Sequence, residues 1–180
     1  MDKLKALARL QHYCAKAERS RFDVRQKLAQ WLVPSIYFNE IIEALEDENY
    51  LNEQRFARAF ANDKFKFEKW GKGKIQMGLK QKKVHPLLIT DALNTIDNAE
   101  YRQMAIYLLA KKDTQLNKEK YNIYEQNQKK AAYLIQKGYE PALIWELLGG
   151  NWNDWSSNLS HLLSYKHANV FNIYIPKTKK

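Results

Sequence analysis

Hydrophobic residues recur at helical spacing along most of the chain, and one pattern of them returns at a fixed distance. Residues 79–93 and 134–148 align without a gap at an offset of 55 residues. Their apolar positions coincide, and so does an early proline, Pro86 in one copy and Pro141 in the other. Apolar residues four apart share one face of a helix, and proline is tolerated in a helix's first turn. Each copy is therefore predicted to be the end of one helix, a short turn and a second helix.

A weaker third copy precedes these two. Two apolar pairs match pairs of the middle copy at offsets of 51 and 48: Val24/Leu28 with Ile75/Leu79, and Ile41/Leu45 with Ile89/Leu93. The connection is three residues longer here and contains Pro34 and Ser35. With a further helix before each pair, the pattern predicts an all-α fold of three tandem three-helix repeats forming an elongated, curved molecule. We expect the repeats at 1–49, 50–99 and 100–149, and a polar, basic and poorly ordered tail at 150–180.

Capping residues and apolar spacing predict local details of these helices. Ser20 and Asp23 have the capping-box spacing, and Asn52 is suited to cap the next long helix. Gly78, inside a predicted helix, is expected to permit close packing. Residues expected on buried faces are Leu4, Leu7 and Cys14 in the first helix, and Phe60, Phe67 and Trp70 in and after the fourth.

Charge is concentrated in the middle of the sequence. Thirty Lys and Arg against twenty Asp and Glu give a net charge of +10, which favours a polyanionic partner. Residues 1–50 are neutral, with eight basic and eight acidic side chains. Residues 64–83 hold eight lysines and a single acid, Glu68. This basic cluster is the first candidate for a binding surface.

The helix predicted within the cluster separates its lysines from its apolar residues. At 100° per residue, Lys74 and Lys80 project away from Ile75 and Leu79. Lysines suit phosphates or an acidic protein surface better than base edges. Aromatic residues interleave with the lysines, as in proteins that stack single-stranded bases, but core packing is the favoured interpretation of their spacing.

Signatures of catalysis, metal binding and membrane insertion are missing from the sequence. The single cysteine excludes an internal disulfide and a cysteine-based zinc site, and the four histidines are scattered. The glycines at 71, 73 and 78 fit neither a dinucleotide fingerprint nor a P-loop. No apolar run approaches the roughly 18 residues of a membrane span, and no signal peptide opens the chain. We expect a non-enzymatic cytoplasmic protein without metal or cofactor.

Several of these segments together resemble a known family. The segments are Ser20-Arg-Phe-Asp-Val-Arg-Gln-Lys-Leu28, Tyr50-Leu-Asn-Glu-Gln-Arg-Phe-Ala-Arg-Ala-Phe60, Gly71-Lys-Gly-Lys-Ile75 with Leu79, and Val84, Ile89, Ala92 and Leu93. They resemble the RecX family, bacterial regulators of the RecA recombinase. The resemblance covers about residues 4–148 and is strongest over 50–93. It implies an all-α protein of three-helix repeats that binds along the groove of the RecA–DNA filament and carries no catalytic residues.

The resemblance also implies a function and partners, and the basic residues of the sequence supply candidate contacts. It implies modulation, in the direction of inhibition, of RecA recombinase and ATPase activity in recombination, DNA repair and the SOS response. The expected partners are the RecA filament and the DNA backbone, contacted without sequence preference by a monomer. The candidate contact residues are Arg21, Arg25, Lys27, Arg55, Lys72, Lys74, Lys80, Lys82 and Lys83. The polar connection from Asp113 to Gln128, with Tyr121 and Tyr124, lies outside the family pattern.

Two other binding functions are compatible with three-helix units. A sequence-specific helix-turn-helix protein would also place a basic helix on DNA, but three near-equivalent units offer no single recognition helix. An RNA-binding helical repeat would need two or three base-reading side chains in every unit, whereas these copies share apolar positions. The family-like regulator is the leading interpretation, and the helix-turn-helix protein is its alternative.

Overall fold

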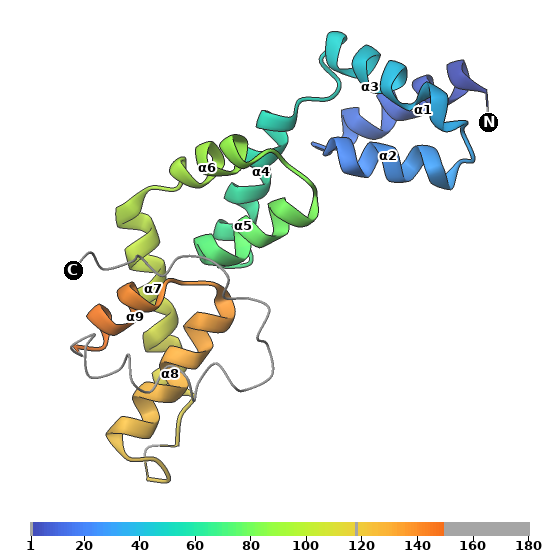
Figure 1. Ribbon diagram of the computed structural model, residues 1–180. Helices are drawn as coiled ribbons and strands as arrows, with labels where there is room; N and C mark the ends of the chain where they lie inside the picture. The colour runs from blue at the N-terminus through green and yellow to red at the C-terminus, as the bar shows by residue number, and fades with distance from the viewer. Residues whose placement is uncertain (1, 118, 150–180) are drawn as a thin grey trace, which may run out of the picture. The chain divides into compact units, whose positions relative to one another are not determined.

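The computed structural model describes residues 2–117 and 119–149, which are helical with short connections and contain no strand (Figure 1). The prediction of an all-α fold is confirmed. The helices are α1 (Lys3–Lys16), α2 (Arg21–Gln30), the 3-10 helix η1 (Ser35–Tyr37), α3 (Phe38–Asp47), α4 (Glu53–Lys66), α5 (Lys72–Gln81), α6 (Pro86–Asn94), α7 (Asn98–Thr114), α8 (Ile123–Lys137) and α9 (Pro141–Leu147). Within these ranges no helix has the length and apolar character that a membrane crossing requires.

The α-helices follow one another in three sets of three, as predicted, and pack into two compact units. The first unit holds residues up to 70 together with 75–97, and the second holds 71–74 and the chain from 98 onwards. The first two sets therefore share one unit, to which the third set contributes nothing. The repeat boundaries at 49/50, 99/100 and 149/150 stay a prediction, and the tail at 150–180 lies outside the described residues.

The core beneath α1 differs in phase from the predicted stripe. Ala6, Leu10 and Cys14 are buried, four residues apart, whereas Leu4 is 72% exposed. Leu7 is partly buried beside them. Leu4 precedes Ala6 by two residues, which places it about 200° away around the helix. Cys14 is a core residue as expected, and burial raises the pKa of its thiol to about 11.

The buried face of α4 contains Phe65 and not Phe67, which the sequence pattern predicted to be buried. Phe67 is 78% exposed, whereas Phe65 is buried and continues a stripe with Ala57 and Ala61. The small alanines set the phase of this face, and Phe67 lies beyond the end of the helix. Gly78 packs closely as predicted, because a Cβ atom there would lie 2.8 Å from the Phe60 ring.

Predicted helix starts are confirmed. Ser20 and Asp23 form a complete capping box at α2, and the Asn52 side chain accepts a hydrogen bond from the Arg55 N–H at the start of α4. Pro86 and Pro141 are the first residues of α6 and α9. The longer first connection forms η1 instead, so α3 begins four residues after Pro34.

The second helix of every set ends in the same left-handed turn. Leu32, Lys83 and Gly138 have φ values of 54°, 57° and 91°. In each turn the next residue donates its N–H to the carbonyl of the residue five positions earlier: Val33 to Leu28, Val84 to Leu79, and Tyr139 to Leu134. All six of these paired residues are buried. This is the hydrogen-bond pattern of a Schellman helix end, so the repeat extends to backbone geometry.

In the second unit the backbone at the start of α5 lies directly against the α8–α9 turn. The Gly71 N–H donates to the Lys137 carbonyl at 2.7 Å, and the Gly73 N–H donates to the Gly138 carbonyl at 3.0 Å. A Cβ atom on Gly71 would lie 2.2 Å from the Gly138 carbonyl carbon. These glycines therefore permit a close approach of two backbones. The α7–α8 connection is shorter than the predicted 113–128, because both helices extend into that range.

Candidate nucleic-acid interface

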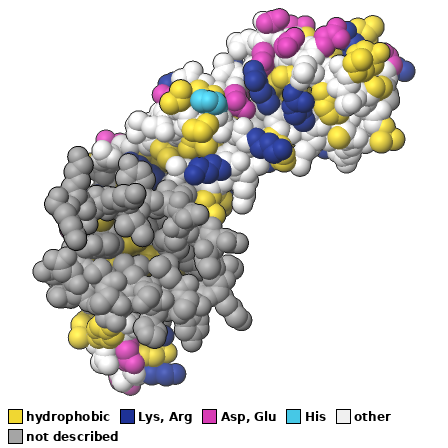
Figure 2. Space-filling view, viewed as in Figure 1, with side chains coloured by type: hydrophobic (Ala, Val, Ile, Leu, Met, Phe, Trp, Pro, Cys, Tyr) yellow, Lys and Arg dark blue, Asp and Glu magenta, His cyan; other side chains and the backbone are white. Residues whose placement is uncertain are grey.

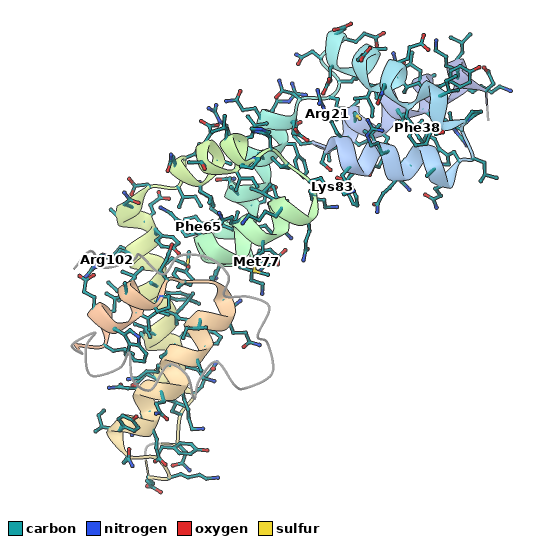
Figure 3. The ribbon with its side chains drawn as sticks, viewed as in Figure 1. Arg21, Phe38, Phe65, Met77, Lys83 and Arg102 are labelled. Carbon is teal, nitrogen blue, oxygen red and sulfur yellow. The ribbon has the colours of Figure 1, made fainter. Side chains whose placement is uncertain are left out.

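An open groove of about 720 Å³ in the first unit brings together basic residues of the first and second sets of helices. Its basic walls come from Arg21 and Arg25 on α2 and from Lys83 and His85 in the α5–α6 turn. Phe22 and Phe38 supply apolar surface, and Glu53 is the one acid among the lining residues. Figure 3 labels Arg21, Phe38 and Lys83 around this groove, and Figure 2 shows basic side chains gathered on the same face. The volume falls in the range of small-ligand sites, about 300–1,000 Å³.

Lys83 reaches the groove because of the turn that follows α5. It is the left-handed residue of the Schellman end, with φ 57°, and its side chain is exposed. Its Nζ lies 5.3 Å from the centre of the Phe22 ring, which belongs to α2. A lysine in this backbone conformation is uncommon, because the Cβ atom crowds the following carbonyl.

Lys82, the preceding residue, ties the two sets together. Its Nζ donates to Asp23 Oδ1 at 2.6 Å, and Asp23 is also the acid of the α2 capping box. Burial alone would raise the pKa of the Asp23 carboxyl, but the hydrogen bonds from Lys82 and Ser20 outweigh it and lower that pKa below its ordinary value. Lys82 therefore positions the groove and is only partly available to a ligand.

The two arginines of α2 that line the groove differ in how many hydrogen bonds hold their side chains. Arg21 makes two hydrogen bonds to Glu46, at 2.6 Å and 2.7 Å, which raise the pKa of its guanidinium. Arg25 is exposed and donates a single hydrogen bond to Asn39 at 2.6 Å. Neutralisation of Arg21 by a carboxylate leaves Arg25 and Lys83 as the groove's best cations for an incoming anion.

Two other predicted contact residues, Arg55 and Lys27, are hydrogen-bonded to neighbouring residues of the first unit. Arg55 donates to Glu18 at 2.5 Å and to the side chain and backbone of Asn49, so it fastens α4 to the preceding segments. Lys27 donates to Gln30 at 3.0 Å and lies over the Tyr13 ring. Neither residue lines the groove. Their positions favour structural roles.

The lysines of α5 are divided by the boundary between units. Lys72 belongs to the second unit, where its N–H donates to the Tyr101 hydroxyl at 3.0 Å and its Nζ to Asn98 at 3.0 Å. Lys74 also belongs there, and its Cβ would lie 2.4 Å from a Cβ on Gly138. Lys80 is exposed in the first unit. The basic cluster of the sequence is thus not one surface.

Sequence reasoning missed several residues of the groove. His85 caps α6 by accepting the Leu87 N–H, and Phe22 and Phe38 supply the groove's aromatic surface. Phe22 lies inside the family-like motif at 20–28, so the sequence could have indicated it. No sequence pattern indicated the residues that face Phe22 across the groove. Burial raises the pKa of the Glu53 carboxyl, partly offset by Arg21.

Comparison with known proteins supports the family resemblance. Residues 52–93 match the family model described as "RecX, second three-helix domain". The regulatory protein RecX of Clostridium perfringens strain 13 is 29% identical over 125 residues, which cover 69% of this chain and 58% of that protein. The chain is similar to RecX-family proteins, and the family model matches its second set of three helices. The resemblance expected from the motifs at 20–28 and 50–93 is therefore confirmed.

Other relatives agree. The regulatory protein RecX of Clostridium botulinum strain Eklund 17B is 33% identical over 98 residues, 54% of this chain and 45% of that protein. The chain thus spans about half the length of these clostridial relatives. The crystal structure of RecX from Lactobacillus salivarius has a TM-score of 0.74 at 20% identity, and the match covers 82% of this chain and 94% of that one. A likeness at this identity supports the shared fold.

Proposed function

We propose that this RecX-like chain binds the RecA–DNA filament and inhibits RecA's recombinase and ATPase activities in recombination and DNA repair. The supporting observation is the groove of the first unit, where cations from two sets of helices converge around Phe22 and Phe38. The proposal places the protein in the cytoplasm, assigns it no catalytic residue and requires no cofactor. RecA is the partner that the motif resemblance implies.

The groove's chemistry suits a phosphate backbone or an acidic protein surface. Arg25 and Lys83 approach it from α2 and from the α5–α6 turn. Arg21, already paired with Glu46, orients the edge of the groove. Contacts of this kind fix position without reading bases, so binding to DNA should be insensitive to sequence and should weaken steeply with salt.

The direct test is steady-state ATP hydrolysis by the cognate RecA on single-stranded DNA while this protein is titrated in. We expect inhibition by the wild type and at least tenfold weaker inhibition by the double variant Arg25→Glu/Lys83→Glu. The matched control is Lys5→Glu/Lys16→Glu, which changes the net charge equally at two exposed positions of α1 in the same unit. Equal loss in both variants would mean that net charge, and not the groove, carries the interaction.

The helix-turn-helix alternative is decided by gel shift with random and operator-like duplexes at two salt concentrations. The proposed function predicts modest affinity for both duplexes, lost together as salt rises. A preference for one duplex that persists at high salt would instead support a sequence-specific DNA-binding protein.

A further inference from the structure

A second exposed surface, the α7–α8 tip, lies in the segment that the family motifs leave unexplained. It consists of the described residues of the connection between α7 and α8 and of the helix ends beside it, 111–117 and 119–133. Ile123 is 68% exposed and Tyr124 is 45% exposed. Lys129 Nζ lies 4.2 Å and Lys120 Nζ 5.6 Å from the centre of the Tyr121 ring. Two lysines thus lie beside the Tyr121 ring, and Tyr124 is exposed three residues further along the chain.

The aromatic residues of the tip are held in place by the surrounding backbone. The Tyr121 N–H donates to the Asn117 carbonyl at 3.3 Å, and the Tyr121 carbonyl accepts from the side-chain amide of Gln126 at 2.7 Å. Gln126 is one of only two buried polar residues in the described chain. Asn122 and Glu125 form a complete capping box that starts α8 at the next residue. The segment that presents Tyr121 and Tyr124 is therefore pre-organised.

The charge of the tip is positive where it is exposed. The described residues 111–117 and 119–133 hold five lysines and three acids. Of the acids, Asp113 accepts a hydrogen bond from Lys130 at 3.2 Å, and Glu125 is engaged in the capping box. Lys112 lies over the Tyr133 ring, 5.5 Å from its centre. Figure 2 shows part of this end of the second unit, with hydrophobic side chains beside charged ones.

The exposed Tyr124 and the half-buried Tyr121, with its neighbouring lysines, have the chemistry of a stacking surface for single-stranded nucleic acid. Every base has a π-face that can stack on an aromatic ring, while nearby lysines bind the phosphates. A lysine that lies over a ring in the free protein can turn to a phosphate when a base takes its place. We propose that the α7–α8 tip binds single-stranded nucleic acid by stacking bases on Tyr121 and Tyr124, separately from the groove of the first unit.

The test measures fluorescence anisotropy of two labelled oligonucleotides of equal length, oligothymidylate and a fully abasic strand, without RecA. Wild type should bind the thymidylate at least about fivefold more tightly, the value of one weak stacking contact. Tyr121→Leu/Tyr124→Leu should bind both strands with the affinity of the abasic one. Tyr121→Phe/Tyr124→Phe, which keeps the rings, should retain the preference. The matched control is Tyr37→Leu/Tyr50→Leu, two tyrosines of the first unit that are 37% and 38% exposed.

Several outcomes would overturn this inference. One is a wild type that does not distinguish the two strands, and another is a leucine double variant that keeps the preference. In the separate RecA ATPase assay, a leucine variant that had bound DNA normally but failed to inhibit RecA would assign the tip to a protein contact instead. If the double variant unfolds, Tyr124→Leu alone decides, because that side chain is 45% exposed. Since RecA is absent from the anisotropy assay, its result is independent of the proposed function.

Discussion

The turn after α5 and the turn after α8 have the same backbone and opposite surroundings. Lys83 and Gly138 are equivalent at the offset of 55 residues, and both have positive φ. In the first unit the turn is open, and the Lys83 side chain extends over Phe22 at the groove. In the second unit the backbone and Cβ of Lys74 occupy the space that a side chain on residue 138 would need. One repeated turn thus presents an exposed cation at the groove in one place and permits close packing in the other.

This difference separates two reasons for a glycine in a left-handed turn. Conformation alone favours glycine at both positions, by about 1–2 kcal/mol over other residues. Only position 138 adds a steric reason, because a Cβ there would lie 2.4 Å from the Lys74 Cβ and 2.5 Å from the Lys74 nitrogen. Leu32 has the same conformation in the turn after α2, with φ 54°, so two of the three turns tolerate a side chain at this position.

The largest expected effect is that of Gly138→Ala. Left-handed strain and overpacking against Lys74 together should lower the free energy of unfolding by about 2–4 kcal/mol, measured by urea denaturation. The control is Gly149→Ala, where φ is also positive, 71°, but no atom of the described residues lies within 4 Å of the added Cβ. That control should lose only about 1 kcal/mol. Similar losses at both glycines would mean that the contact with Lys74 relaxes freely.

A smaller effect is expected at Lys83. Lys83→Gly and Lys83→Ala both remove the ammonium from the groove, so both should weaken inhibition of RecA. Both should also lower the slope of the logarithm of the binding constant against the logarithm of salt concentration by about one. Between the two, the glycine variant should be more stable by about 1 kcal/mol, because only alanine retains the strain of positive φ. A difference as large as that at position 138 would show that the turn after α5 is also sterically closed.

Much of this comparison could be predicted from the sequence, and its limits have physical causes. The offset of 55 residues correctly paired Leu79 with Leu134 and Pro86 with Pro141, because buried apolar residues and a first-turn proline leave a periodic record. The exposure of Lys80, away from the buried Ile75, agrees with helix geometry, whereas Lys74 is only half-exposed. The contact of Lys74 with Gly138 could not be predicted, since it joins residues 64 positions apart that share no sequence pattern.

The candidate site was predictable only as a list of basic residues. Arg25 and Lys83 come together across two sets of helices, and the pairing of Arg21 with Glu46 removes one cation from the list of free ones. The sequence pattern also predicted that Phe67 is buried, whereas Phe65 is the buried residue and Phe67 is exposed. Two of the buried positions that define the packed face of α4 are alanines. Alanines contribute little to a hydrophobic pattern that is recognised by its large residues.

The smallest expected effect concerns Lys82, which neighbours Lys83 in the first of the two turns and holds Asp23. Lys82→Met keeps the aliphatic stem and removes the ammonium, so at pH 7 it should lower the free energy of unfolding by about 0.5–1 kcal/mol. The folded-state pKa of Asp23 is lowered, so the stabilisation is complete above the unfolded pKa and disappears as pH falls through the folded value. The difference between wild type and Lys82→Met should therefore shrink as urea titrations are moved from pH 7 to below pH 4. Lys80→Met, at an exposed position of α5, is the control and should follow wild type at every pH. A difference that stayed constant down to pH 3 would show that Lys82 stabilises the first unit by packing, and that the link between Asp23 and the turn is not electrostatic.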